Sequence, residues 1–176
     1  MQATPSPNEP SRRSFLAASA AGAAALAAVS SPLNAGVFAA GSDLLKVGLI
    51  GCGGRGSGAA EQALNADPAT EIVALGDIFE DYIAGPRRSL TRQFNKEGVT
   101  PRITVTDDTC YSGFDNYLRV IEKSDVVLLA TTPHFRPQHL RAAVEAGKHV
   151  FCEKPVAVDA PGVRSVMESS KMAAEK

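Results

Sequence analysis

The sequence predicts an α/β fold, built as a doubly wound and mostly parallel sheet with helices on both faces. Three observations predict it: apolar runs of strand length alternate with helical segments, a glycine cluster follows the first run, and an aspartate ends the second. Strands and helices alternating at this spacing form βαβ units with right-handed crossovers. A composition of 44% hydrophobic and 21% charged residues, with a formal net charge of −1, suits a globular domain. It argues against a disordered chain and against a nucleic-acid binder, which would carry a basic patch.

Residues 1–40 are predicted to be an export signal, and residues 44–176 to be one domain. No residue between Ser14 and Ser42 is charged, and Ala, Gly and Ser dominate this stretch. A transmembrane helix would need more Leu, Ile and Phe, so the weakly apolar core of a signal peptide fits better. Just before it, residues 11–16 (SRRSFL) resemble the twin-arginine signal. We therefore expect export to the periplasm by the twin-arginine machinery, with an ordinary basic leader as the alternative.

The first half of the domain is predicted to contain two strands and two helices. Residues 45–50 (LKVGLI) are a short apolar run typical of a buried parallel strand, and residues 71–77 (EIVALGD) are a second. Residues 59–65 between them have a helix-forming composition. The segment 78–97 is expected to be helical in its second half, and because Gly85-Pro86 interrupts it, the helix should either start late or be kinked.

The middle of the domain continues the alternation. A short third strand is predicted at residues 102–106, followed by a helix and then by the clearest buried strand, residues 125–131 (DVVLLAT). One face of that helix is predicted to carry Phe114, Tyr117, Leu118 and Ile121.

The last part is predicted to hold two helices around a fifth strand. Pro137 in the first turn of one helix and Gly147 just past its end are the usual start and stop signals. Residues 149–152 form the fifth strand, and Asp159 is the predicted N-cap of the last helix.

A glycine loop, GCGGRG, fits the pattern G-x-G-x-x-G directly after the first strand and before the first helix. In that context Gly51 permits the tight turn, Gly53 lets the backbone approach a diphosphate, and Gly56 permits close helix–strand packing. Backbone N–H groups at the helix N-terminus then supply donors and partial positive charge. Gly54 belongs to the same loop, and Arg55 either reaches the phosphates or is solvated.

Asp77 ends the second strand, where such a loop expects a ribose-binding carboxylate. A carboxylate accepts hydrogen bonds from both adenosine ribose hydroxyls and repels a 2′-phosphate, so Asp77 favours NAD over NADP as the cofactor. A turn aspartate at a strand end is the alternative. Loop, strand order and acid together predict a dinucleotide-binding Rossmann domain.

Two more strand ends should lie at the same edge, because ligands in open α/β sheets bind at the carboxyl ends of the strands. One is the fourth-strand turn, which comprises Thr131, Thr132 and Pro133. The other is the Glu-Lys-Pro segment, which comprises Glu153, Lys154 and Pro155.

Three stretches of the chain resemble one enzyme family. Residues 47–53 (VGLIGCG), 146–150 (AGKHV) and 152–155 (CEKP) together look like the glucose–fructose oxidoreductase / inositol dehydrogenase (Gfo/Idh/MocA) family. The resemblance covers essentially all of the chain after the signal. It implies an oxidoreductase that transfers hydride between a nicotinamide cofactor and a hydroxyl of a sugar, sugar acid or cyclic polyol.

The resemblance assigns catalysis to Lys154 and Glu153. Lys154 would lie beside the nicotinamide and the substrate hydroxyl, where it can hold the substrate oxygen and help accept its proton. Glu153 would orient the lysine or the nicotinamide ribose, and Pro155 would fix the backbone. The alternative is a surface Glu-Lys pair that ends a strand.

The resemblance also implies that the backbone of Thr132 and Pro133 borders the cofactor. The family commonly places a histidine a few residues later, and Arg136 stands near that position, between His134 and His139. Which of the three side chains does its work is left open, and His139 is expected to be a capping or solvated residue.

Family members have a second α/β domain that carries most of the substrate pocket and the usual oligomer interface. The resemblance implies that this chain lacks that domain and holds only the cofactor half of the active site. A homo-oligomer is then expected only where the second domain is present. Two alternatives remain: an NAD-dependent glycosidase of the same superfamily, and a truncated, non-catalytic nucleotide-binding module.

The cysteines predict neither a disulfide framework nor a metal site. Three of them, Cys52, Cys110 and Cys152, are too few and too odd in number for a disulfide scaffold. Cys52 falls in the glycine loop and Cys152 in a strand expected to be buried, so pairing them would distort the sheet. The spacing of His and Cys residues matches no metal-ligand pattern, and we expect reduced thiols.

Overall fold

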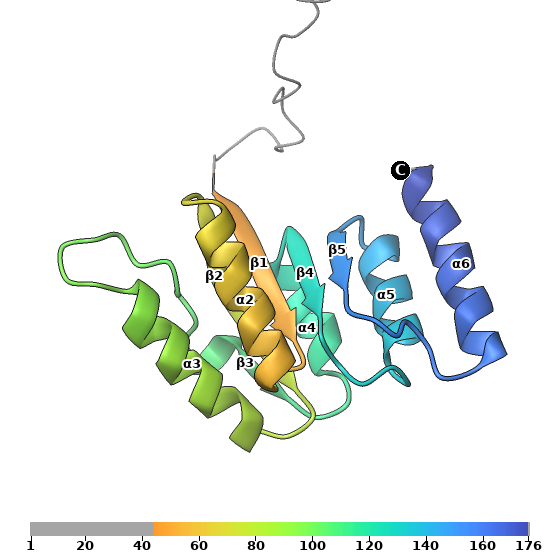
Figure 1. The fold of residues 1–176 in the computed structure, drawn as a ribbon, viewed down its shortest axis with the longest axis horizontal. Coiled ribbons are helices and arrows are strands. Elements are labelled where there is room, and N and C mark those ends of the chain that lie inside the picture. The colour runs from red at the N-terminus through yellow and green to blue at the C-terminus, as the bar shows by residue number, and fades with distance from the viewer. Residues whose placement is uncertain (1–43, 176) are drawn as a thin grey trace, which may run out of the picture. The chain divides into compact units, whose positions relative to one another are not determined.

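A computed structural model describes residues 44–175. They form a parallel sheet in the order β3-β2-β1-β4-β5 (Figure 1), which confirms the predicted doubly wound α/β fold. The predicted export signal lies outside the described residues. The strands are β1 (Leu45–Ile50), β2 (Thr70–Asp77), β3 (Cys110–Ser112), β4 (Val126–Leu129) and β5 (His149–Cys152). The helices are α2 (Gly54–Ala66), α3 (Asp81–Phe94), α4 (Asn116–Lys123), α5 (Arg136–Glu145), α6 (Ala160–Ala174) and a short 3-10 turn at Asp107–Thr109.

Both faces of the sheet are covered by helices. Figure 1 shows α2 and α3 in front of the sheet and α4 behind it. Successive strand residues point to opposite faces, so Leu49 packs in the cluster under α2 and α3, whereas Ile50 packs in the cluster with α4. The α6 helix packs against α5. Within residues 44–175, no helix is long and apolar enough to cross a membrane.

The third strand differs from its prediction. Ile103 makes only an isolated bridge to Ile72, and the strand itself lies at Cys110–Ser112. The bridge consists of two backbone bonds, from the Ile72 N–H to the Arg102 carbonyl and from the Thr104 N–H to the Ile72 carbonyl, whereas the N–H groups of Arg102 and Ile103 donate to Asn95 Oδ1 at 2.9 Å. Those donors are therefore taken by a side chain rather than by a neighbouring strand.

The α3 helix also differs, since it runs without interruption from Asp81 through Pro86 to Phe94. Pro86 lacks the N–H that would bond the Tyr82 carbonyl. Tyr82 is 56% exposed, so water can solvate that carbonyl, and burial of Ile83 and Leu90 holds the helix on the sheet. The predicted late start of this helix is therefore wrong.

The face predicted for α4 is half correct. Tyr117 and Ile121 are buried, but Leu118 is 49% exposed and Phe114, just before the helix, is 69% exposed. The true inward face also includes Val120. A helix begun two residues later than the pattern suggests turns Phe114 away from the core.

The predicted start and stop signals of the last two helices are confirmed. Pro137 lies in the first turn of α5, and Gly147 after it has a φ of 70°, a left-handed conformation that favours glycine. Asp159 caps α6 by accepting from the Gly162 N–H at 2.7 Å. The β5 strand pairs only with β4 and is partly exposed, so Cys152 is half-buried rather than fully buried as expected.

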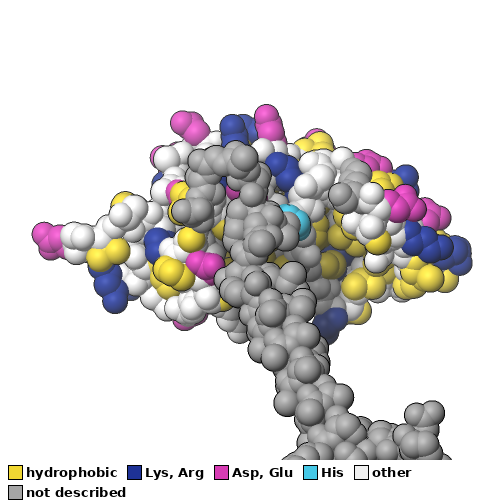
Figure 2. All heavy atoms as spheres, turned by 90° about the horizontal axis from the view of Figure 1, so that it is seen from above, with side chains coloured by type: hydrophobic (Ala, Val, Ile, Leu, Met, Phe, Trp, Pro, Cys, Tyr) yellow, Lys and Arg dark blue, Asp and Glu magenta, His cyan; other side chains and the backbone are white. Residues whose placement is uncertain are grey.

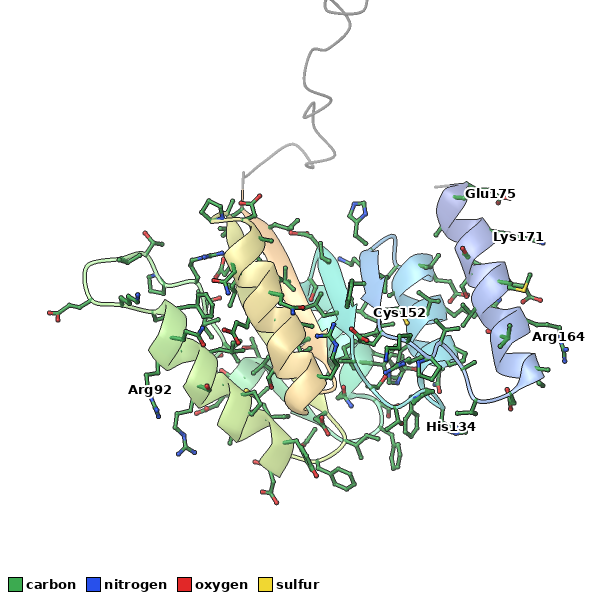
Figure 3. The ribbon with its side chains drawn as sticks, in the orientation of Figure 1. Arg92, His134, Cys152, Arg164, Lys171 and Glu175 are labelled. Carbon is green, nitrogen blue, oxygen red and sulfur yellow. The ribbon has the colours of Figure 1, made fainter. Side chains whose placement is uncertain are left out.

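The amino ends of the strands form one edge of the sheet. Figure 2 views the molecule from this side, and acidic and basic side chains are interspersed around its rim. The carboxyl ends of the strands lie at the other edge, which Figure 3 shows at the bottom with His134 beside it. The fold therefore brings the glycine loop, Asp77 and the fourth-strand turn to a common edge.

Candidate functional site

A cavity of about 560 Å³ lies at the carboxyl ends of β1, β2 and β4. From β1 the chain continues to β2 on one side of the sheet, and β4 lies on the other side of β1. The cavity lies at this topological switch point, where such sheets bind ligands. Polar and glycine positions line it together with aromatic rings. The predicted site residues that line it are Gly51, Gly53, Asp77, Thr131 and Thr132, and its aromatic lining comprises Phe79, Tyr82, Phe114 and Phe135.

The glycine loop has the geometry that a diphosphate requires. Gly51 has a φ of 94°, and a Cβ there would lie 2.5 Å from the backbone nitrogen of Thr131. A Cβ at Gly56 would lie 1.8 Å from the Gly51 carbonyl oxygen. At Gly53 a Cβ would meet nothing within 4 Å, and no side chain caps α2, which starts at Gly54. The first-turn N–H groups of α2 are therefore open to a bound anion.

Asp77 ties the end of β2 to the glycine loop. Its Oδ2 accepts from the Cys52 N–H at 2.8 Å, and its Oδ1 accepts from the Phe79 N–H at 3.1 Å. A carboxylate has about four acceptor positions, so these two bonds do not use all of the acceptor capacity of Asp77. The neighbouring Cys52 thiol is buried, and burial raises its pKa far above the ordinary value.

The cysteines are all free thiols. Cys110 and Cys152 are partly buried, and desolvation raises the pKa of each. Thiols with raised pKa values are poor nucleophiles and poor metal ligands. Among residues 44–175, His, Cys, Asp and Glu side chains form no cluster of three that could hold a metal ion.

Arg136 connects the fourth-strand turn to the Glu-Lys-Pro segment. Only 6% of Arg136 is exposed. Its Nε donates to the Thr131 carbonyl and its Nη1 to the Glu153 carbonyl, both at 2.7 Å, and Nη1 also donates to the Pro155 carbonyl. These bonds hold the carboxyl ends of β4 and β5 side by side, so the role of Arg136 is structural. Its burial also keeps the guanidinium away from a substrate. Sequence reasoning missed this role, because a single arginine in a first helical turn has no distinguishing pattern.

His139 is buried, which corrects the expectation of a capping or solvated histidine. It is 2% exposed and lies between two rings, with centroids 4.2 Å from Tyr117 and 5.9 Å from Phe135. Within residues 44–175, its Nδ1 has no hydrogen-bond partner. Helical spacing places His139 on the inward side of α5, and that side packs on α4. Of the three candidates for the family's histidine position, His134 alone is exposed.

The pH dependence of stability should report the burial of His139. Burial lowers its pKa to about 4, so the folded protein keeps the ring neutral while the unfolded chain protonates near its ordinary value. Stability is therefore full above about pH 6.5 and is lost as the pH falls toward 4, by about 3 kcal/mol at most. Urea unfolding at pH 7 and pH 4.5 measures this loss. His139→Phe keeps the stacking and cannot titrate, so it should lose less stability; an equal loss in both proteins contradicts the assignment.

Glu153 and Arg55 form an ion pair across the site. The Glu153 side chain is 8% exposed and that of Arg55 is 49% exposed. The hydrogen bond from the Arg55 guanidinium holds the pKa of Glu153 below its usual range, so this carboxylate stays ionised. Arg55 is therefore not simply solvated, because it pairs with a carboxylate from another segment. Glu153 in turn contacts the glycine loop through this pair.

Lys154 is exposed and lies between Glu153 and Pro155. The Glu153 side chain pairs with Arg55, and the carbonyls of Glu153 and Pro155 both accept from Arg136. The side chain of Lys154 therefore projects from a backbone that is anchored on both sides. Lys154 does not line the cavity itself, but its exposed amine follows β5 at the same edge of the sheet.

Comparisons with known proteins agree with this geometry. A family model named GFO_IDH_MocA, "Oxidoreductase family, NAD-binding Rossmann fold", matches residues 45–176. "Glycosyl hydrolase family 109 protein 1" of Bacteroides fragilis is 33% identical over 132 residues, which cover 73% of this chain and 26% of that protein. "Inositol 2-dehydrogenase" of Cereibacter sphaeroides is 28% identical over 127 residues, which cover 72% and 33%.

A solved structure shows the same fold. The crystal structure of myo-inositol 2-dehydrogenase from Lactobacillus plantarum superposes with a TM-score of 0.58 at 21% identity, covering 76% of this chain and 34% of that one. The chain thus spans between about a quarter and a third of the length of the proteins it matches.

Proposed function

Because this chain belongs to the Gfo/Idh/MocA oxidoreductase family and has its NAD-binding Rossmann fold, we propose that it is the cofactor-binding part of a carbohydrate oxidoreductase. The reaction is hydride transfer between NAD and a hydroxyl-bearing carbon of a sugar, sugar acid or cyclic polyol. One observation carries the proposal: the glycine loop and Asp77 lie at the same sheet edge as the fourth-strand turn and the Glu-Lys-Pro segment. Relatives named inositol 2-dehydrogenase support the polyol class.

The residues present fit a dinucleotide along this edge. Asp77 would bind the adenosine ribose, and the open N–H groups near Gly53 and Gly54 would bind the diphosphate. The buried Oγ1 of Thr131 has no partner among the described residues, and Thr131 lines the same cavity as Gly53. When bound, NAD supplies the hydride acceptor. In its neutral amine form, Lys154 would accept a hydrogen bond from the substrate hydroxyl and take its proton, becoming an ammonium, as the hydride leaves the adjacent carbon.

A glycosidase is the second candidate, and one observation favours it. The relative that is 33% identical is named as a glycosyl hydrolase. In such a reaction NAD stays bound, the sugar is oxidised and later reduced again, and no NADH accumulates. The same site residues would serve both reactions at the oxidation step.

Net formation of NADH separates the two candidates. We would incubate the protein with NAD and a panel of sugars, sugar acids and inositols, and follow absorbance at the NADH band. In parallel, chromogenic glycosides would be incubated with the protein and NAD. NADH formation supports the oxidoreductase, and glycoside cleavage without NADH supports the glycosidase. NAD binding with turnover of neither class would instead indicate a non-catalytic nucleotide-binding module.

Replacing Asp77 by alanine tests the ribose assignment and the preference for NAD over NADP. We expect Asp77→Ala to weaken NAD binding by roughly ten- to thirtyfold, because charge-assisted hydrogen bonds to the ribose are lost. Binding of NADP should fall less, since the carboxylate that repels its 2′-phosphate is gone. Calorimetric titration measures both affinities, with Asp108→Ala as the exposed control. An unchanged NAD affinity would show that Asp77 does not bind the ribose.

We also propose that the chain is exported to the periplasm by the twin-arginine pathway. The adjacent pair Arg12-Arg13, followed by Phe15-Leu16 and an alanine-rich stretch, supports this. Replacing both arginines by lysine should stop export, because the pathway recognises the arginine pair. Fractionation of cells that express the wild type and the double variant measures it. Normal periplasmic accumulation of the variant would refute the twin-arginine assignment.

A further inference from the structure

The ion pair between Arg55 and Glu153 spans three strands of the sheet. Arg55 lies in the first turn of α2, directly after β1, and Glu153 directly follows β5. The sheet order places β4 between β1 and β5. The pair therefore crosses the carboxyl end of β4, between the diphosphate-binding loop and Lys154.

Glu153 places a negative charge at the same edge of the sheet as the proposed dinucleotide site. Its side chain is 8% exposed, so water solvates the carboxylate poorly and a positive partner is needed to keep the charge there. A diphosphate bound at the glycine loop would be repelled by an unpaired carboxylate at this edge. Something must therefore neutralise Glu153 before a dinucleotide binds.

Arg136 is close to Glu153 but is occupied elsewhere. Its guanidinium donates to the backbone carbonyls of Thr131, Glu153 and Pro155 rather than to the Glu153 carboxylate. Arg55 contacts the carboxylate itself. Its side chain is half-exposed at the glycine loop, with only a long contact of 3.5 Å to Gln62 as a further bond.

We propose that Arg55 is a positioning residue that neutralises and holds Glu153, and that it does not act chiefly as a ligand of the diphosphate. The diphosphate is then bound by the backbone N–H groups of the glycine loop, and Arg55 removes the repulsion that Glu153 would exert on it. The inference rests on the proposed function, because it takes NAD as the ligand of this edge.

A double-mutant cycle on NAD affinity tests the proposal. We expect Arg55→Met to raise the Kd for NAD by about tenfold, because it leaves Glu153 unpaired. Glu153→Gln should change the Kd by less than Arg55→Met does. The double variant Arg55→Met/Glu153→Gln should bind NAD better than Arg55→Met alone, to within about threefold of the wild type. Arg55→Lys, which keeps the charge, should lie between Arg55→Met and the wild type.

Matched controls separate this from a loss of structure. Arg92→Met and Glu97→Gln make the same chemical changes at exposed positions, and Figure 3 shows Arg92 projecting from the outer side of α3. Both should bind NAD as the wild type does, and thermal unfolding of every variant would be measured alongside. A double variant that binds as weakly as Arg55→Met would overturn the proposal, because Arg55 would then contact the diphosphate directly. A wild-type chain that binds no NAD would overturn the proposed function as well.

Discussion

Replacing Lys154 by methionine is expected to lower the rate of hydride transfer by about 10²- to 10⁴-fold. Methionine keeps the length of the side chain but can neither hold the substrate oxygen nor accept its proton. NAD affinity should change by less than about threefold, because the glycine loop and Asp77 bind most of the dinucleotide. Single-turnover formation of NADH, with a substrate found in the panel described above, measures the rate.

Two other lysine variants sharpen this expectation. Lys171→Met removes an exposed lysine on α6, which Figure 3 shows pointing away from the sheet, and should leave the rate unchanged. Lys154→Arg keeps the positive charge but cannot take a proton, since arginine remains protonated in proteins. It should therefore be nearly as slow as Lys154→Met. A Lys154→Met enzyme with wild-type turnover would exclude Lys154 from the chemistry.

Replacing Gly56 by alanine should remove NAD binding almost completely, with a loss of at least about a hundredfold. The new Cβ would lie 1.8 Å from the Gly51 carbonyl oxygen, a backbone atom, so α2 has to move away from β1. Gly51 cannot yield, because it lies tightly against the backbone of Thr131. A displaced α2 takes its first-turn N–H groups away from the diphosphate. Calorimetric titration with NAD and urea unfolding measure both consequences.

Gly58 offers the matched control, because it lies in the same helix. A Cβ at Gly58 would meet only Arg55 Nη1, at 3.9 Å. Gly58→Ala should therefore bind NAD normally and gain about 0.5–1 kcal/mol of stability from the better helix propensity of alanine. Equal NAD affinities in Gly56→Ala and Gly58→Ala would show that close packing of α2 on β1 is not needed for the site.

Much of the fold follows from local patterns, and these could be read from the sequence. The apolar runs predict the bounds of β1 and β5 correctly, because each run stops at a glycine or a charged residue, Gly51 after β1 and Glu153 after β5. The cap of α6 by Asp159 is equally local. The predictions failed where a local signal met a competing contact. Asn95 takes two donors of the predicted third strand, those of Arg102 and Ile103, and burial of Ile83 and Leu90 holds α3 on the sheet across Pro86.

The sequence by itself determined the fold class, the glycine loop and the position of Asp77, because each depends on residues close together in the chain. Only the tertiary structure decided how Arg55, Arg136 and His139 are used. Arg55 reaches Glu153, and Arg136 reaches both strand ends, because β5 lies beside β4 in the sheet. His139 is buried because α5 packs on α4. The partner of a charged or titratable side chain depends on which strands and helices the crossovers place beside it. The spacing of residues along the chain does not specify this arrangement.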